Sequence, residues 1–160
     1  MRRNDREITD KNGIFEIIEK CDVCRIGLAR NNIPYIVPMS FGYEYVDDSL
    51  TIYFHCAKEG KKLDIIKENS AVCFEFDCSR RVIPGEKANN YTMEYESVIG
   101  GGNIVIVSDD DAGEKRRALS LLMKKYAPEK AFEFSEADIN SVTVLKLTSD
   151  DFTGKRNKKL

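Results

Sequence analysis

Apolar residues recur at helical spacing in three stretches of the chain. The first stretch follows the spacing i, i+3, i+4 and i+7 and consists of Ile14, Ile17, Ile18 and Cys21. This spacing predicts a short amphipathic helix, which Thr9 or Asp10 can cap. The segment 58–69 predicts a second helix, with its buried side at Leu63 and Ile66. A third helix is predicted after Asp109–Asp111, and its stripe before Pro128 is Leu119, Leu122, Met123 and Tyr126.

Alternation of apolar and polar residues predicts strands around these helices. Six strand-like segments are expected, at 24–29, 34–39, 50–55, 72–76, 91–107 and 142–147. Asn31–Asn32 and Asp47–Asp48 predict turns, and 79–90 predicts a loop. Gly100–Gly102 predicts a bulge or sharp bend in the fifth strand. Since the strands mostly follow one another directly, the order favours a mainly β, antiparallel sheet or barrel with added helices over a doubly wound parallel sheet.

Size and charge narrow the functional classes. The 160 residues suit a single domain spanning 1–160, with a basic tail at about 154–160. The net charge of -2 gives no general attraction to nucleic acid or to an anionic membrane. Neither a signal peptide nor an apolar run long enough to cross a bilayer is present, so we expect a cytoplasmic protein. The basic tail alone leaves nucleic-acid binding open, although such a tail on an acidic domain is usually just solvated.

The cysteines do not predict a disulfide framework or a metal site. There are five of them, an odd number. Cys21 and Cys24 form a C-x-x-C pair, but a zinc site needs a second pair, and Cys73 with Cys78 has looser spacing. Cys24 and Cys73 are instead expected to point inward as small apolar side chains. The sequence therefore predicts no metal.

The segment 54–64 is the strongest candidate for binding chemistry. A strand ends at His55, a short turn follows, and a helix begins with Lys61 and Lys62 in its first turns. A helix start offers unpaired N–H groups and a positive dipole end, so two lysines there suit a bound anion such as phosphate. The alternative is that both lysines are only solvated. His55, the single histidine, either packs at a barrel end or serves a cofactor as a hydrogen-bond or proton donor.

Two further segments are candidates for contact with a ligand. In the run 35–43, Pro38 cannot donate to a strand ladder, and a local break in pairing would free backbone groups for a planar ligand. The alternative is an ordinary edge strand, which this run taken alone favours. In the run 94–100, small and apolar residues lead into the glycines, which suits close approach of a ligand or a barrel corner. Glu94 and Glu96 point the same way on this strand, but that pattern alone is weak support for a glycosidase.

Together these segments resemble a known family. Val37-Pro38-Met39-Ser40-Phe41-Gly42-Tyr43, Phe54-His55-Cys56-Ala57-Lys58-Glu59-Gly60-Lys61-Lys62-Leu63-Asp64 and Tyr95-Glu96-Ser97-Val98-Ile99-Gly100 occur in this order. The chain is similar to the FMN-binding split barrels related to pyridoxamine 5'-phosphate oxidase, and within them to the nitroimidazole-resistance proteins. The first residues, Met1-Arg2-Arg3, and the segment 153–156 near the C-terminus also resemble those of this family, so the resemblance covers almost the whole chain.

The resemblance implies a six-stranded antiparallel split β-barrel and a homodimer that holds FMN between its subunits. Contacts to the isoalloxazine ring would come from Val37, Pro38, Met39 and Ser40. The phosphate would be surrounded by His55, Cys56, Ala57, Lys61 and Lys62. Ser97 and Val98 would close the site, from the other subunit. Gly101 and Gly102 are expected to make this last segment flexible.

The implied function is that of a flavoprotein oxidoreductase that reduces a small planar acceptor, such as a nitro-aromatic compound. The flavin supplies the redox chemistry, and His55 is the candidate proton donor. The basic C-terminal substrate signature of pyridoxamine 5'-phosphate oxidases is missing, so vitamin B6 oxidation is not assigned. The alternative is a non-catalytic protein that binds, stores or senses a flavin, a deazaflavin or haem, which the lack of an obvious catalytic constellation favours.

Overall fold

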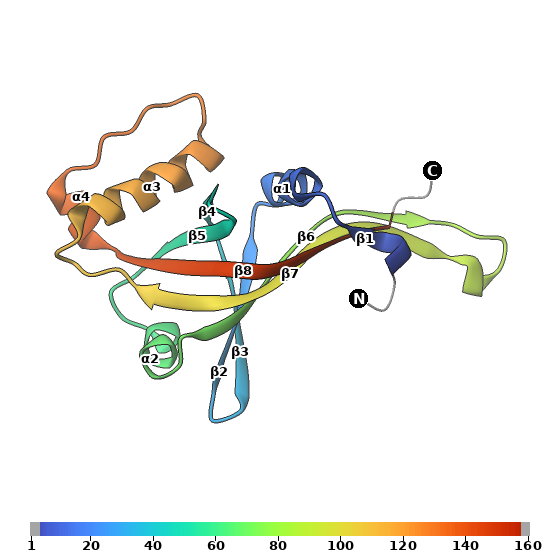
Figure 1. Ribbon diagram of the computed structural model, residues 1–160, viewed down its shortest axis with the longest axis horizontal. Helices are drawn as coiled ribbons and strands as arrows, with labels where there is room; N and C mark the ends of the chain where they lie inside the picture. The colour runs from blue at the N-terminus through green and yellow to red at the C-terminus, as the bar shows by residue number, and fades with distance from the viewer. Residues whose placement is uncertain (1–3, 158–160) are drawn as a thin grey trace.

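The computed structural model describes residues 4–157 and contains one antiparallel sheet with helices packed around it (Figure 1). The helices are α1 (Lys11–Lys20), α2 (Lys61–Glu68), α3 (Ala112–Tyr126) and α4 (Glu136–Ser141). The strands are β1 (Glu7–Ile8), β2 (Cys24–Arg30), β3 (Ile33–Met39), β4 (Gly42–Val46), β5 (Ser49–Cys56), β6 (Ala71–Ile83), β7 (Thr92–Ile106) and β8 (Thr143–Asn157). Two short 3-10 helices span Asn4–Arg6 and Ala88–Asn90.

The sheet is open, as expected for a split barrel. Its strand order is β3-β2-β6-β7-β8-β5-β4, and β1 pairs with β8 beside this path. The prediction of a mainly β, antiparallel split barrel is confirmed. The structure has eight strands where six were expected, because β4 and the two-residue β1 were not recognised from the sequence.

Both predicted hairpin turns are present. Asn31 and Asn32 have φ values of 53° and 62°, and Asp47 and Asp48 have φ values of 51° and 61°. Two successive residues with positive φ are typical of type I′ turns, whose twist matches that of paired strands. Asn and Asp tolerate this conformation, so the local sequence determines the β2–β3 and β4–β5 hairpins.

The strands β6, β7 and β8 extend beyond the barrel as a long arm (Figure 1). The predicted loop at 79–90 is therefore wrong in its first part, because β6 continues to Ile83 and pairs with Thr92 of β7. The predicted tail is also wrong in part, because Gly154–Asn157 belongs to β8 and pairs with both β1 and β7. Lys158 and Lys159 lie outside the described residues.

The glycine run is an ordered part of β7. The register between β7 and β8 shifts between Gly101 and Asn103, which confirms the expected bulge. A Cβ at Gly102 would overlap the carbonyl oxygen of Thr148, and one at Gly100 would overlap the ring of Phe74. These glycines are needed for close packing, so the expectation that the run is flexible was wrong.

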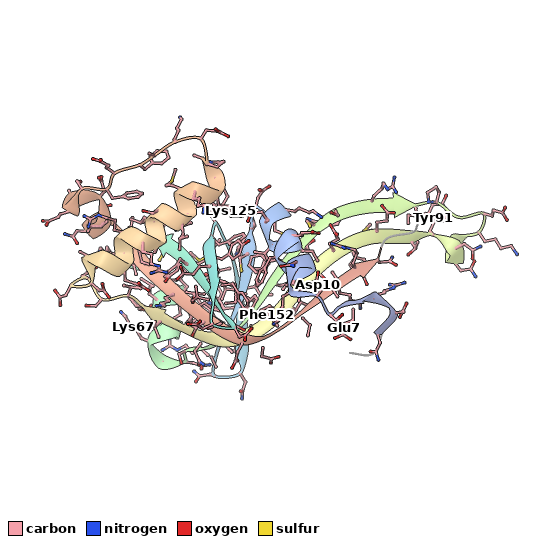
Figure 2. The ribbon with its side chains drawn as sticks, turned by 45° about the horizontal axis from the view of Figure 1, so that its top comes forward. Glu7, Asp10, Lys67, Tyr91, Lys125 and Phe152 are labelled. Atoms are coloured by element: carbon pink, nitrogen blue, oxygen red, sulfur yellow. The ribbon has the colours of Figure 1, made fainter. Side chains whose placement is uncertain are left out.

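The core has two parts. The larger one lies between the curved sheet and helices α1 and α2, and the predicted stripe of α1 is buried in it. A smaller one lies under α3 and α4 around Tyr53, Leu122 and Ile139. Figure 2 shows side chains filling the barrel, with Tyr91 out on the arm. None of the helices within residues 4–157 has the length and apolar character needed to cross a membrane.

Candidate functional site

The start of α2 differs from the starts of the other three α-helices. Asp10, Asp111 and Ser135 cap α1, α3 and α4 with side-chain oxygens. Gly60 precedes α2 with a φ of 147° and provides no side-chain cap. The first-turn amides of α2 therefore face no competing carboxylate or hydroxyl from the capping residue, which is the arrangement that suits an anion.

Two lysines flank this helix start, as the sequence predicted. The ammonium of Lys61 lies 4.5 Å from the centroid of the Tyr35 ring on β3, at cation–π distance. Lys62 lies beside the thiol of Cys56 at the end of β5. Burial raises the pKa of Cys56, and the hydrogen bond and charge of Lys62 only partly oppose this effect. The thiol therefore stays protonated at neutral pH.

The contact between Lys61 and Tyr35 joins the helix after β5 to the terminal strand β3. Four strands separate β3 from β5 in the strand order, yet the helix that follows β5 reaches β3. The curvature of the sheet thus brings together the first two segments that the sequence singled out. His55 and Ala57 are exposed at the end of β5, next to the start of α2.

An acidic residue holds the turn before α2 in place. The carboxylate oxygen Oδ1 of Asp109 lies 2.7 Å from Nζ of Lys58 and 2.8 Å from Nζ of the buried Lys115. Hydrogen bonds from Lys115 and Lys58 lower the pKa of Asp109 to about 2. At neutral pH the carboxylate therefore ties the turn at Lys58 to the start of α3.

The segment Val37–Ser40 lies at one end of the sheet. The run forms an edge strand, the interpretation that the run alone favours, and the local break in pairing at Pro38 is not present: β3 pairs with β2 from Ile33 to Met39, with Pro38 opposite Arg25. The reason is that β3 is a terminal strand of the sheet, where a proline can direct its missing N–H away from the paired strand. The side chains of Pro38 and Ser40 are exposed, Val37 is half-buried and Met39 is buried.

Ser97 and Val98 do not join these residues within one chain. Ser97 pairs with Asp77 of β6 and Lys155 of β8, and Val98 is fully buried in the core. Ser97 lies six residues from Asn103, whose partner Ala71 follows α2, so it is roughly 20 Å further along β7. The side chain of Val98 can contact only the core.

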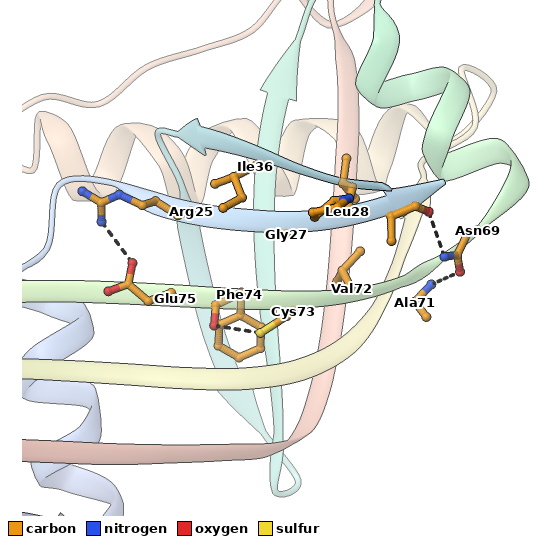
Figure 3. Close-up of a pocket in the computed structure, with 12 residues that line it drawn as sticks. Arg25, Gly27, Leu28, Ile36, Asn69, Ala71, Val72, Cys73, Phe74 and Glu75 are labelled. Atoms are coloured by element: carbon orange, nitrogen blue, oxygen red, sulfur yellow. Dashed lines mark hydrogen bonds and ion pairs between the residues drawn. The ribbon is translucent and has the colours of Figure 1, made fainter. Parts of the chain in front are cut away.

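The outer face of β2, β3 and β6 carries an apolar groove of about 710 Å³ (Figure 3). The alternation in β6 turns Val72, Phe74 and Phe76 inward, so Cys73 faces outward into this groove. The prediction that Cys73 points inward was therefore wrong, whereas Cys24 is buried as expected. Ile36 on this face is 66% exposed, and Arg25 bridges to Glu75 at 3.1 Å at the edge of the groove.

The remaining cysteines do not build a metal site. Cys21 and Cys24 are buried free thiols, and burial is the largest factor that raises the pKa of each. Among residues 4–157, no group of three or more His, Cys, Asp or Glu side chains is arranged to hold a metal ion.

Comparison with models of protein families shows to which family the chain belongs. The model of the pyridoxamine 5'-phosphate oxidase family matches residues 10–156. The chain belongs to this family. Among solved structures, a candidate 5-nitroimidazole antibiotic resistance protein from Bacteroides thetaiotaomicron is 34% identical, with 94% of this chain and 86% of that chain covered and a TM-score of 0.80. The predicted resemblance to this family and to its nitroimidazole-resistance branch is confirmed.

More distant structures share the fold of this pyridoxamine 5'-phosphate oxidase family member. An FAD and heme binding protein from Mycobacterium smegmatis is 18% identical, with 96% and 74% of the two chains covered and a TM-score of 0.81. A flavocytochrome from Azotobacter vinelandii is 16% identical, with 99% and 72% covered and a TM-score of 0.78. A search of curated proteins gave no match.

Sequence reasoning missed two residues that shape the site of this family member. Tyr35 is the first residue of the run 35–43, but nothing in the sequence indicated that its ring would contact Lys61. Tyr126 was assigned to the buried stripe of α3, yet it is 41% exposed and its hydroxyl accepts a hydrogen bond from the backbone of Phe41 at 3.0 Å. Since 85 residues separate this pair, no local pattern could reveal it.

Proposed function

We propose that this chain is a flavoprotein that binds FMN and reduces a small planar acceptor, such as a nitro-aromatic compound. The observation that carries the proposal is the start of α2, where Gly60 leaves the helix without a side-chain cap and Lys61 and Lys62 supply two ammonium groups. Two proteins with the same fold support a flavin ligand: one is named as an FAD and heme binding protein, and the other as a flavocytochrome.

The residues at this helix start fit a phosphate group. Backbone N–H groups and lysine ammonium groups can donate to the same phosphate oxygens, and the helix dipole adds to the attraction. In the ligand-free chain, two lysines at the positive end of a helix are electrostatically unfavourable. A dianionic phosphate would reverse this effect, so the lysines have a physical reason to be there.

The terminal strand β3 fits the planar part of the ligand. Pro38 and Ser40 are exposed, and no further strand covers the outer edge of β3 among the described residues. Backbone groups of Val37–Ser40 on that edge are therefore available to orient an isoalloxazine ring. Bound flavin supplies the electron transfer, and His55, exposed nearby, is the candidate donor of a proton to the acceptor.

A second copy of the chain would complete the site. Ser97 lies on a different part of the sheet from Lys61, so one chain does not enclose a ligand between them. The apolar groove beside Cys73 and the 66% exposed Ile36 give the outer face of the sheet the character of an interface. We therefore propose a homodimer in which this face is covered and Ser97, together with the backbone of Val98, approaches the partner's flavin.

Flavin titration tests the ligand assignment. The purified protein is incubated with FMN and desalted, and Kd values for FMN and for riboflavin are measured by fluorescence. In the double variant Lys61→Ala and Lys62→Ala, FMN affinity should fall about 100-fold, since each ammonium contributes a charge-assisted hydrogen bond. Riboflavin has no phosphate, so its affinity should change less than about twofold. Lys67→Ala, at the other end of α2, is the matched control.

Two outcomes would contradict this assignment. Wild-type protein that retains no flavin after desalting would remove the proposed cofactor. An equal loss of FMN and riboflavin affinity in the double variant would show that the lysines do not bind the phosphate.

Sedimentation tests the dimer. Ile36→Glu places a charge on the outer face and should convert the protein to a monomer with weakened FMN binding. Val46→Glu changes a residue that is 53% exposed at the far end of β4, and it should remain a dimer. A wild-type protein that is monomeric at micromolar concentration, or an Ile36→Glu variant that still dimerises, would contradict the proposed interface.

A second candidate function is flavin or haem binding without turnover. It is favoured by the composition of the site, where His55 is the single histidine of the chain and the lysines serve binding rather than proton transfer. Reduction of a nitro-aromatic acceptor with a nicotinamide donor, compared with free FMN at the same concentration, separates the two functions. Turnover no faster than with free FMN would leave only the binding role.

A further inference from the structure

The last two residues of α3 contact both the end of α1 and the segment that follows β3. Nζ of Lys125 lies 2.9 Å from the carbonyl oxygen of Glu19 and 3.3 Å from that of Ile18, so it caps the C-terminal end of α1. The same ammonium lies 4.7 Å from the centroid of the Phe41 ring. Only 7% of the Lys125 side chain is exposed, and it lies between α3 and α1 (Figure 2).

Tyr126 makes the second contact. Its hydroxyl donates to the carbonyl oxygen of Asp22 at 2.7 Å and accepts from the backbone N–H of Phe41 at 3.0 Å. Burial raises the pKa of the Tyr126 phenol, and hydrogen bonds from Phe41 and the Ser40 side chain only partly offset this. The phenol is therefore neutral at physiological pH and can make both kinds of hydrogen bond.

Ser40 and Phe41, which these contacts hold, connect the two terminal strands of the sheet. β3 and β4 occupy opposite ends of the strand order, and the two residues between them carry the chain from one end to the other. The backbone of such a crossing makes no strand ladder of its own, so its N–H groups need other partners. Tyr126 supplies one for Phe41, directly after Val37–Ser40.

We infer that Tyr126, together with Lys125, positions the segment Val37–Ser40 and thereby sets the geometry of the flavin ring site. The inference rests on the proposed function. Tyr126 is a positioning residue, because it acts through the backbone of Phe41. The ring of Phe41 is buried in the core, and the contacts from α3 add support for the backbone of this crossing.

Tyr126→Phe tests the inference with little disturbance, since it removes one hydroxyl and keeps the ring. In the ligand-free protein, hydrogen exchange of the Phe41 amide should accelerate at least about tenfold, since the hydrogen bond that protects it is lost. In the FMN-loaded protein, the Kd should rise about tenfold. The absorption bands and the reduction potential of the bound flavin should also shift, which a purely structural role would not cause.

Tyr45→Phe is the matched control, because it removes a phenol that donates to Asp48 at 2.7 Å on the opposite terminal strand. It should leave the Phe41 exchange rate and the flavin spectrum unchanged. If wild-type protein retains FMN but Tyr126→Phe matches it in Kd, spectrum and potential, the positioning role is refuted while the proposed function stands. If wild-type protein retains no flavin, the proposed function fails and this role fails with it.

Discussion

The carboxylate of Glu96 is the most consequential buried charge of the arm. Glu96 lies on β7 with no exposed side-chain surface. Its oxygens lie 2.6 Å from the Ser79 hydroxyl, 3.3 Å from Nζ of Lys20 and 2.5 Å from Nε of Arg156. These partners come from α1, β6 and β8, so one carboxylate joins three elements at the root of the arm.

The contribution of this carboxylate to stability follows from its pKa. Burial alone would raise the pKa of Glu96, but hydrogen bonds from Ser79 and Lys20 hold it at about 2, against an ordinary value of 4.5. The charge of Arg156 acts in the same direction. Because one pKa unit corresponds to about 1.4 kcal/mol, ionised Glu96 stabilises the folded state by about 3 kcal/mol.

The sign of the pH dependence is fixed by the lowered pKa. The stabilisation is complete above pH 4.5, where the carboxyl is ionised in the unfolded chain as well, and it is lost as the pH falls toward 2. Glu96→Gln should therefore lower the free energy of unfolding by about 3 kcal/mol at pH 7 and by only about 1.5 kcal/mol at pH 3. Urea unfolding followed by circular dichroism measures both values without adding salt.

The matched control is Glu68→Gln. Glu68 forms an ion pair with Arg30, and both side chains are about half exposed, at 49% and 47%. Such surface pairs contribute at most about 1 kcal/mol, so this variant should change stability little. The reasoning is refuted if Glu96→Gln costs no more than the control at pH 7, or if its cost is the same at pH 7 and pH 3.

Three further predictions concern the glycine run, a helix cap and the cofactor. Gly102→Ala should lower the melting temperature sharply or prevent folding, because its Cβ would overlap the Thr148 carbonyl. Gly101→Ala should melt near the wild type, because its Cβ has its nearest neighbour at 3.9 Å. Equal melting temperatures of the two variants would contradict this packing. Asp111→Ala should cost about 1 kcal/mol in urea unfolding, since its side chain accepts a 3.0 Å hydrogen bond from the amide of Glu114; an unchanged midpoint would show that the cap is dispensable. FMN at 100 times its Kd should stabilise the protein by about 2.7 kcal/mol in thermal unfolding, and no shift in protein that retains flavin would contradict binding to the folded state alone.

The fold could be predicted where local sequence determines local structure. The turns at Asn31–Asn32 and Asp47–Asp48 carry residue types that tolerate positive φ, and the stripe of α1 is regular, so these elements were recognised. The length of β6 and β8 could not be predicted. Ser79–Ile83 and Gly154–Asn157 are polar or glycine-containing segments. They belong to strands because β6 and β8 both pair with β7, which lies between them.

The candidate site could be predicted only in part for a similar reason. The helix that carries Lys61 and Lys62 has a local signature and is present, but it begins at Lys61 and not at the predicted residue 58, because the backbone at Gly60 is not helical. Its contact with Tyr35 depends on the curvature of the whole sheet, and the contact of Tyr126 with Phe41 depends on where α3 packs. The proposed roles of Ser97 and Val98 depend on a second chain, which no pattern within one chain can place.

The start of α2 also links the proposed phosphate ligand to the stability of the helix. A Ser, Asp or Asn at position 60 would stabilise the helix by about 1 kcal/mol, but its oxygen would occupy the amides that an anion needs. The φ of 147° at Gly60 excludes this solution, because side chains other than hydrogen are strained there. Lys61 and Lys62 add repulsion from the helix dipole. The ligand-free protein therefore has a weakly stabilised helix start, and a bound phosphate would relieve both disadvantages, the missing side-chain cap and the repulsion of the lysines by the helix dipole.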